Sequence, residues 1–252
     1  MSTYIASIDA LDVKGRCEIA SVSLVHDEPG YEPEVLLPDD EWGPLAAKQV
    51  TSLRPPADAT GNMLHEIIRL PVGSDELARI RESSTEYSLN HSQTINFDPF
   101  AGGHASTFIG HVDSPGGQRT TTVDQRFGKH NGIHLDNFDQ LPISERANSR
   151  RRLAVNLGPG HRFLILATKD VWDVTAGNQI LDDYPRTADV REFVRRGGAL
   201  NCVRIRIEPG EGYVAPTEVV PHDGSTSGIG VSSRIAFWLG RWPAGVLPSA
   251  IS

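Results

Sequence analysis

Short runs in which apolar and polar residues alternate, separated by Gly or Pro turns, are the feature that most restricts how this chain can fold. Runs of this kind cover residues 3–8, 17–25 and 202–207. A period of two places every second side chain on the same face of a β-strand. The chain has 24 Gly and 17 Pro among its 252 residues, enough turns to connect many such strands. The pattern therefore favours a mainly-β, loop-rich fold over a helical bundle.

Other segments extend this prediction. Further strands are predicted at 94–97, 106–111, 118–126 and 234–239, and the runs 151–158 and 162–167 flank a Gly-Pro-Gly turn and predict a β-hairpin. Helices are predicted at 42–53 and 62–70, from Ser74 onward, and at 187–197. We expect these helices to pack outside a β core, with 3–8 and 17–25 as edge strands.

Charge and cysteine content argue against several classes of protein. The formal net charge of -8 disfavours a surface for nucleic acid or for an anionic membrane, because phosphate groups are bound by basic faces. Cys17 and Cys202 lack the CxxC spacing of a zinc knuckle and predict buried free thiols. No apolar run reaches the ~20 residues that span a bilayer, and the N-terminus lacks a signal-peptide pattern. We therefore expect a cytoplasmic protein.

Two histidines and an aspartate stand where they could bind one metal ion. His134 and Asp136 are two residues apart at the end of β-prone sequence, so on a strand they share a face. His222 follows a Val-rich predicted strand far downstream. Two His and one carboxylate on one side of a metal, with the opposite positions open, suit a non-haem Fe(II) site. The three residues therefore predict a metal centre.

A second H-x-D pattern, His111-Val112-Asp113, competes with this interpretation. It is followed at once by the sequence SPGG, which predicts a loop with no strand behind it. The strand signals around His134 therefore favour the first pattern.

Arg234 lies on the next predicted strand after His222. A guanidinium inside a β-barrel is costly unless an anion pairs with it, and Arg holds a carboxylate through two parallel hydrogen bonds. We interpret Arg234 as a carboxylate-binding residue; the alternative is a surface arginine beside a turn. Asn156 and Arg152 lie on the strand after the H-x-D pattern, where their side chains could face the same opening. For Asn156 the alternative is a polar residue that closes a strand before a Gly turn.

The order and spacing of His134, Asp136, His222 and Arg234 resemble the Fe(II)/2-oxoglutarate-dependent oxygenases, over roughly residues 118–240. The resemblance implies a double-stranded β-helix, which is a jelly-roll or cupin-like fold. It also implies that His134, Asp136 and His222 ligate Fe(II), that Arg234 binds the distal carboxylate of 2-oxoglutarate, and that O2 takes a remaining position. Asn156 is then a candidate contact for 2-oxoglutarate or substrate.

One position departs from the family's pattern. Ala236 stands where these oxygenases often have a hydroxyl residue, two positions after the arginine. Residues that could supply the hydroxyl instead are Thr217, Thr226, Ser232 and Ser233.

The same resemblance sets the expected domain and activity. We expect one catalytic domain over residues 1–252, in which a part of about residues 1–90 packs on a jelly-roll core of about 91–242. The expected activity is hydroxylation, desaturation or oxidative cyclisation of a small molecule, such as an amine-bearing intermediate of natural-product (for example antibiotic) biosynthesis. Two alternatives stay open: another metal-dependent cupin enzyme, either an isomerase or a dioxygenase that needs no 2-oxoglutarate, and a jelly-roll binding module without catalysis.

Overall fold

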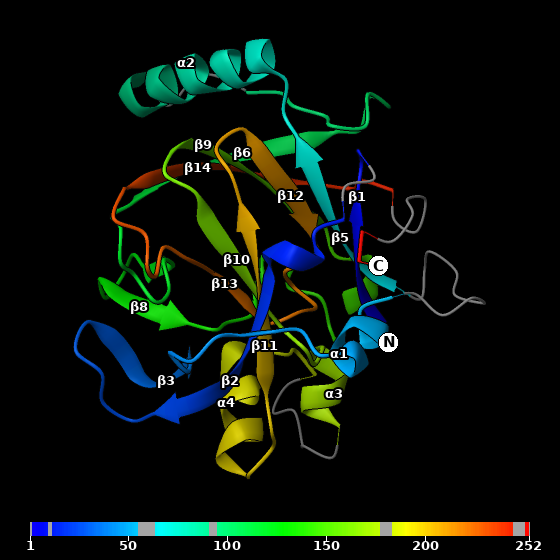
Figure 1. The fold of residues 1–252 in the computed structure, drawn as a ribbon, viewed down its shortest axis with the longest axis vertical. Helices are drawn as coiled ribbons and strands as arrows, with labels where there is room; N and C mark the ends of the chain where they lie inside the picture. Colours follow the sequence, from blue (N-terminus) through cyan, green and yellow to red (C-terminus); the bar gives the residue numbers. More distant parts are fainter. Residues whose placement is uncertain are drawn as a thin grey trace.

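The computed structural model describes residues 2–9, 12–54, 64–90, 95–176, 183–243 and 250–251, and their strands form two sheets that share a core (Figure 1). The first sheet has the strand order β1 (Ser2–Ser7), β5 (Leu64–Pro71), β12 (Glu211–Ala215), β9 (Arg151–Pro159), β14 (Ser233–Gly240) and β6 (Ser106–Ser114). The second has the order β13 (His222–Ser225), β10 (Arg162–Ala167), β11 (Asn201–Ile207), β2 (Cys17–Val25), β3 (Tyr31–Pro38), β8 (Lys129–Gly132) and β7 (Val123–Asp124), with β4 (Gly43–Pro44) paired to β2.

In the first sheet, the inner strands β12, β9 and β14 are largely buried on both faces. Its inner face carries Ala154, Tyr213 and Ile235, which join the core shared with the second sheet. Its outer face carries Ala236 and Trp238, in a second apolar cluster that is covered by helix α2 (Ser74–Asn90) and by residues 95–100. Figure 1 shows α2 crossing over this sheet at the top of the molecule. A side chain's position along β9 or β14 therefore decides whether it points into the core or toward α2.

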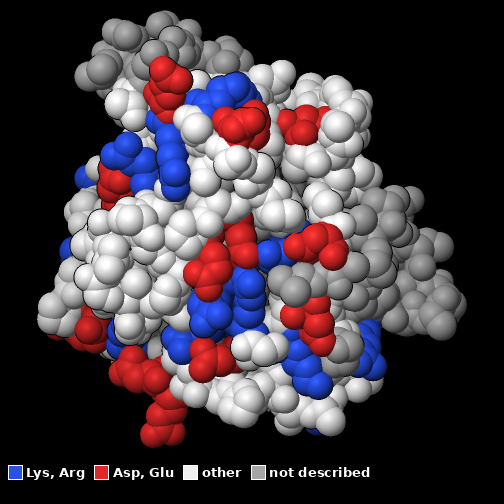
Figure 2. All heavy atoms as spheres, turned by 45° about the horizontal axis from the view of Figure 1, so that its top comes forward, with Lys and Arg blue, Asp and Glu red and all other residues white. Residues whose placement is uncertain are grey.

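Three shorter helices complete the described fold. These are α1 (Ala47–Ser52), α3 (Val171–Thr175) and α4 (Thr187–Arg195). Helix α4 contacts α3 and strands β2 and β3, so it lies on the second sheet. None of the described helices is long and apolar enough to cross a membrane. On the face drawn in Figure 2, acidic and basic side chains lie next to one another rather than in separate areas.

The second sheet curls until its two ends meet. Strand β13 lies at one end, and β8 lies near the other, where it pairs with β3. Directly after β8, the N–H of His134 donates to the carbonyl of His222 at 3.1 Å, and the N–H of His222 donates back to the carbonyl of His134 at 2.9 Å. We call this contact the seam. It makes two residues that are far apart in the sequence direct neighbours.

The mainly-β prediction is confirmed, and the strands are arranged like those of a jelly roll. Strands β6, β11 and β14 and helices α2 and α4 also form where they were predicted. The helix predicted at 42–53 is shorter, because residues 43–44 form β4 and α1 begins only at Ala47.

Five local predictions are wrong. Of the helix predicted at 62–70, residues 64–70 lie in β5, an inner strand, and residues 62–63 lie outside the described residues. Of the strand predicted at 118–126, only residues 123–124 form one, β7. Strands β9 and β10 do not pair as a hairpin; the turn at 160–161 carries the chain from the first sheet to the second. Residues 17–25 form an inner strand, not an edge strand. Residues 95–97 are not in a strand, and residue 94 lies outside the described residues.

Candidate metal centre

The seam brings His134, Asp136 and His222 together in the interior. One donor atom from each lies within 4.8 Å of the others, and all three side chains are buried. Asp136 Oδ1 is 3.8 Å from His134 Nε2, and Asp136 Oδ2 is 3.6 Å from His222 Nε2. Metal bonds to such donors are about 2.0–2.2 Å long, so one ion could reach all three once they draw together slightly. The two imidazoles and one carboxylate therefore form a donor set that fits a divalent metal.

Backbone carbonyls fix which ring nitrogen of each histidine faces the carboxylate. His134 Nδ1 is 2.8 Å from the carbonyl of Gly132, and His222 Nδ1 is 3.3 Å from that of Val220. In each ring Nδ1 therefore carries the proton, which leaves the lone pair on Nε2. Metal-binding histidines commonly use this arrangement, in which the second nitrogen donates to an outer partner.

Asp223 is an outer partner that the sequence reasoning missed. Its Oδ2 lies 3.5 Å from His134 Nδ1, and its Oδ1 accepts the N–H and hydroxyl of Thr122 at 3.1 and 2.8 Å. Being the residue after His222, it orients the other histidine from across the seam. The one available signal was its place beside a predicted ligand, because a carboxylate often supports a metal-binding histidine from behind.

The protonation of Asp136 and His222 also suits metal binding. Burial lowers the pKa of His222 to about 3, so its imidazole is neutral. Burial acts to raise the pKa of Asp136, but the charge of Arg152 and the two imidazoles outweigh it and hold this pKa below its usual value. At His134 burial acts the other way, and the hydrogen bond and charge of Asp223 raise its pKa on balance. Asp136 is therefore a carboxylate and His222 a free lone-pair donor at neutral pH.

Arg152 reaches into this cluster from β9. Its Nη2 lies 2.6 Å from Asp136 Oδ2, and its Nη1 is 3.4 Å from His222 Nε2. The guanidinium carbon is 5.4 Å from the ring centre of Phe138 and 5.2 Å from that of Phe237. The sequence placed Arg152 on the strand after the H-x-D pattern, and the structure shows that its side chain does enter the interior.

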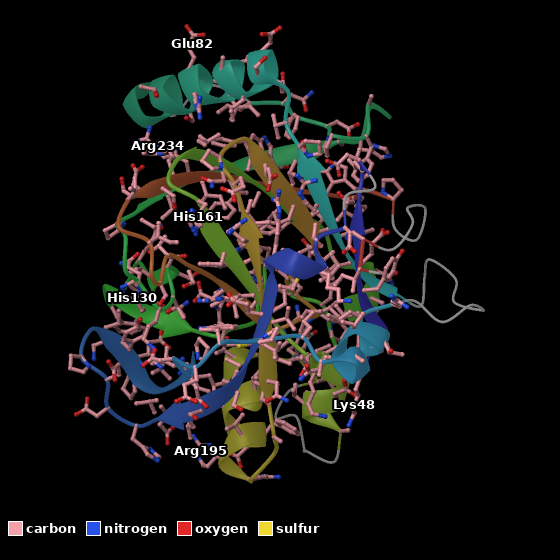
Figure 3. All side chains as sticks on the ribbon, in the orientation of Figure 1. Lys48, Glu82, His130, His161, Arg195 and Arg234 are labelled. Carbon is pink, nitrogen blue, oxygen red and sulfur yellow. The ribbon has the colours of Figure 1, made fainter. Side chains whose placement is uncertain are left out.

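Arg234 does not lie at the site, which corrects its predicted role. On β14 it shares the face of Ala236 and Trp238, which points toward α2. Figure 3 labels it beneath that helix. Arg152 pairs with Leu239, and Arg234 is five residues farther along β14, or about 16 Å away.

The alternative interpretation of Arg234, a surface arginine, describes it correctly. Its side chain is 36% exposed and binds both carboxylate oxygens of Asp113, at 2.7 and 2.8 Å. Asp113 belongs to the second H-x-D pattern, which lies at the end of strand β6, and the predicted loop follows it at residues 115–117.

Asn156 also has a structural task in place of the predicted one. Its amide nitrogen donates to the carbonyls of Gly160 and Ile207, at 3.0 and 3.1 Å, and its oxygen accepts the N–H of Gly158 at 3.0 Å. The amide thus holds the turn after β9 in place. This corresponds to the alternative of a polar residue that closes a strand before a Gly turn.

A different arginine, Arg162 on β10, lies beside the metal cluster. It is 3% exposed, and its guanidinium donates to the hydroxyls of Thr121, at 3.0 Å, and Ser233, at 3.4 Å. No carboxylate of the described residues lies within 4 Å of it, and burial lowers its pKa. A buried guanidinium whose hydrogen-bond partners are neutral hydroxyls is costly, so Arg162 marks a candidate anion-binding site.

Gly224 leaves the space that this guanidinium fills. A β-carbon at Gly224 would lie 2.5 Å from both Arg162 Nη2 and Thr121 Oγ1. Gly224 follows His222 by two residues on β13, so both face the interior. The position that faces the candidate anion site is therefore one same-face step, about 7 Å along the strand, from His222 of the metal cluster. Ser233, one of the hydroxyl residues considered from the sequence, takes part in it.

A buried ion pair braces the loop that carries Asp136. Arg146 and Glu218 are both fully buried and lie 2.6 Å apart. Arg146 also donates to Asn137 Oδ1 at 2.8 Å, while Glu218 accepts the N–H of Asp139 at 2.9 Å. Because Glu218 stands just before the strand of His222, this pair fixes the two ligand-bearing segments to each other.

Comparison of the chain with protein-family models, with curated proteins and with solved structures finds no match. Any functional inference therefore rests on the geometry of the metal cluster and the anion site.

Proposed function

We propose that the chain is an Fe(II)- and 2-oxoglutarate-dependent dioxygenase that oxidises a small organic molecule on a double-stranded β-helix. The observation that carries this proposal is the buried Arg162, which has no carboxylate partner among the described residues. It lies against Gly224, one same-face step along β13 from His222 of the metal cluster. A metal site and a carboxylate site at this separation fit the two ends of a five-carbon keto diacid.

The donor set supports Fe(II). Two imidazoles and one carboxylate leave positions open on the metal, which is the arrangement that non-haem Fe(II) oxygenases use. Fe(II) held by His134, Asp136 and His222 would supply O2 activation coupled to decarboxylation of 2-oxoglutarate to succinate. The chain's own residues set the ligand geometry through Gly132, Val220 and Asp223 and keep the site buried.

Arg162 would take the role that the resemblance assigned to Arg234. Its planar guanidinium can bind a carboxylate through two parallel hydrogen bonds, while the hydroxyls of Thr121 and Ser233 lie in reach to add further ones. A keto acid end directed toward the cluster and a distal carboxylate at Arg162 would place the co-substrate along β13.

The balance of charge supports a dianion. Imidazoles that bind a metal are neutral, and the remaining ionised groups beside the cluster are then Arg152, Arg162, Asp136 and Asp223, whose charges sum to zero. A divalent metal would leave two uncompensated positive charges in a buried site, at a high cost in desolvation. A dicarboxylate such as 2-oxoglutarate restores neutrality, whereas a neutral or amine ligand alone does not.

The test is anaerobic reconstitution with Fe(II) followed by addition of 2-oxoglutarate. We expect one Fe(II) per chain, a visible absorption band on chelation of 2-oxoglutarate, and succinate formation when O2 is admitted together with a substrate from an amine- and amino-acid panel. His222→Ala should lose iron and the band together. Iron binding with turnover that needs no 2-oxoglutarate would favour the cupin alternative. If neither iron nor 2-oxoglutarate binds, the remaining interpretation is a binding module without catalysis.

A further inference from the structure

The guanidinium of Arg152 lies on the same donor atoms that a metal ion would use. Its Nη2 lies 2.6 Å from Asp136 Oδ2, and its Nη1 lies 3.4 Å from His222 Nε2. Since His222 Nδ1 faces the carbonyl of Val220, Nε2 carries this imidazole's lone pair. Arg152 therefore points a donor at the lone pair that a metal ligand must offer.

A divalent ion and this guanidinium cannot share these atoms. One lone pair on His222 accepts either an N–H or a metal ion. A metal bound about 2.0–2.1 Å from Nε2 would also lie close to the positive guanidinium, and like charges at such a distance repel strongly in a buried site. Binding of the metal therefore requires Arg152 to leave its present contacts.

Two aromatic rings mark where the guanidinium can go. It lies between Phe138 and Phe237, with its central carbon within 5.4 Å of both ring centres. Phe237 belongs to the core, whereas Phe138 is 43% exposed and stands at the rim of the site. Ring faces attract a cation, so a small rotation along Phe138 keeps one favourable contact while Asp136 is released.

We propose that Arg152 and a divalent metal ion are alternative occupants of the Asp136 and His222 donor atoms, and that the displaced guanidinium binds a carboxylate beside the metal. The inference deepens the proposed function, because it names an anionic organic acid as the ligand that this part of the site recognises. The carboxylate belongs either to the substrate or to the keto acid end of 2-oxoglutarate, since both would approach the open side of the metal.

The first arm of the test measures metal affinity without any turnover. Co(II) is titrated into the full chain under anaerobic conditions and followed by its visible absorption. We expect Arg152→Met to bind Co(II) more tightly than the wild type, by a factor on the order of 5 to 150, the usual span of coupling between two sites. Arg152→Lys should also bind it more tightly, because one ammonium cannot contact both donor atoms as the planar guanidinium does.

Arg234→Met is the matched control, because it removes an arginine that is paired with Asp113 away from the cluster. Its Co(II) affinity should equal that of the wild type. Equal or weaker Co(II) binding by both Arg152 variants would overturn the proposal and make Arg152 a permanent support of Asp136. If Arg152→Met does not fold, Arg152→Lys alone decides this arm.

The second arm tests the carboxylate. Phenylacetate, a carboxylate that chelates metals poorly, and phenethylamine, its amine counterpart, are added to separate Co(II) titrations. Phenylacetate should tighten Co(II) binding in the wild type but not in Arg152→Met, and phenethylamine should do so in neither. If phenylacetate has no effect but 2-oxoglutarate tightens Co(II) binding less in the variant, the carboxylate is that of the co-substrate. Equal effects of every ligand in wild type and variant would refute carboxylate binding.

These outcomes are separable from those of the proposed function. If the wild type binds Co(II) but never consumes 2-oxoglutarate, the dioxygenase assignment is wrong, while the exchange between Arg152 and the metal ion still stands. If the enzyme needs 2-oxoglutarate but its Arg152 variants bind Co(II) no more tightly than the wild type does, the dioxygenase assignment stands and the inference about Arg152 is wrong.

Discussion

Replacing Arg162 with methionine should stabilise the fold and weaken the binding of 2-oxoglutarate. The two effects have the same origin, which is a positive charge buried beside two hydroxyls, without a carboxylate of the described residues within 4 Å. In the folded chain the guanidinium is buried, and its hydrogen-bond partners among the described residues are two neutral hydroxyls. Methionine fills most of the same volume and has no charge to desolvate.

The size of each effect follows from the contacts. Loss of a buried, two-hydrogen-bond partner of a carboxylate costs about 2–5 kcal/mol of binding. That corresponds to a ~30- to several-thousand-fold rise in the dissociation constant of 2-oxoglutarate, at about 1.4 kcal/mol per decade. Replacing buried ionic groups with apolar ones of similar size stabilises proteins by up to about 1–4 kcal/mol. For a chain of this length, the midpoint of thermal unfolding should rise by at least about 2 °C.

The assay combines calorimetric titration of 2-oxoglutarate into the Co(II)-loaded chain with thermal unfolding in the absence of ligand. Arg234→Met is again the control, because it removes the same charge from a 36% exposed side chain. It should leave both quantities near their wild-type values. If Arg234→Met weakens 2-oxoglutarate binding and Arg162→Met does not, the carboxylate site lies under α2 and the argument from burial fails.

Three further substitutions or treatments test other parts of the site. Gly224→Ala should weaken 2-oxoglutarate binding, measured by calorimetry, yet keep Co(II), because the new methyl group displaces the guanidinium of Arg162. Arg146→Met should lower the free energy of unfolding, measured in urea, by about 3–5 kcal/mol, because it leaves the carboxylate of Glu218 buried without its arginine partner. Cys17, whose pKa burial raises to about 12, should resist iodoacetamide at pH 8 in the native chain and react after unfolding, as read by mass spectrometry. Unaltered 2-oxoglutarate affinity in Gly224→Ala would contradict the first prediction, and an unchanged unfolding midpoint in urea for Arg146→Met would contradict the second. Alkylation of Cys17 in the native chain at the rate of the unfolded chain would contradict the third.

The three residues of the metal cluster could be found from the sequence because their residue types and spacing indicate metal ligands before the fold is known. Two of them, His134 and Asp136, have a spacing that puts them on one face of a strand, and few residue types other than His and carboxylates bind hard or borderline metals. Arg234 and Arg162 were not distinguishable in this way. Each stands next to a strand of apolar residues, and choosing between them requires knowing which face of that strand is inward.

The first sheet explains why that information is missing from the sequence. Its inner strands pack against apolar groups on both faces, so Ile235 and Phe237 on one side of β14 are as apolar as Ala236 and Trp238 on the other. A strand buried on both faces loses the period-two pattern that separates inside from outside. The same loss made the segment around Ile67 and Ile68 look helical. Pairing between distant strands, such as the separation of β9 and β10 into two sheets, leaves no local signal either.

The seam also has a kinetic consequence. The backbones of His134 and His222 hold each other through two hydrogen bonds at the point where the ends of the second sheet meet. An ion held by both side chains would crosslink the same two segments, so the junction could open only after one of the histidines has released the ion. Local opening of the sheet would then follow dissociation of the ion, and deuterium would replace the two amide hydrogens no faster than the ion dissociates.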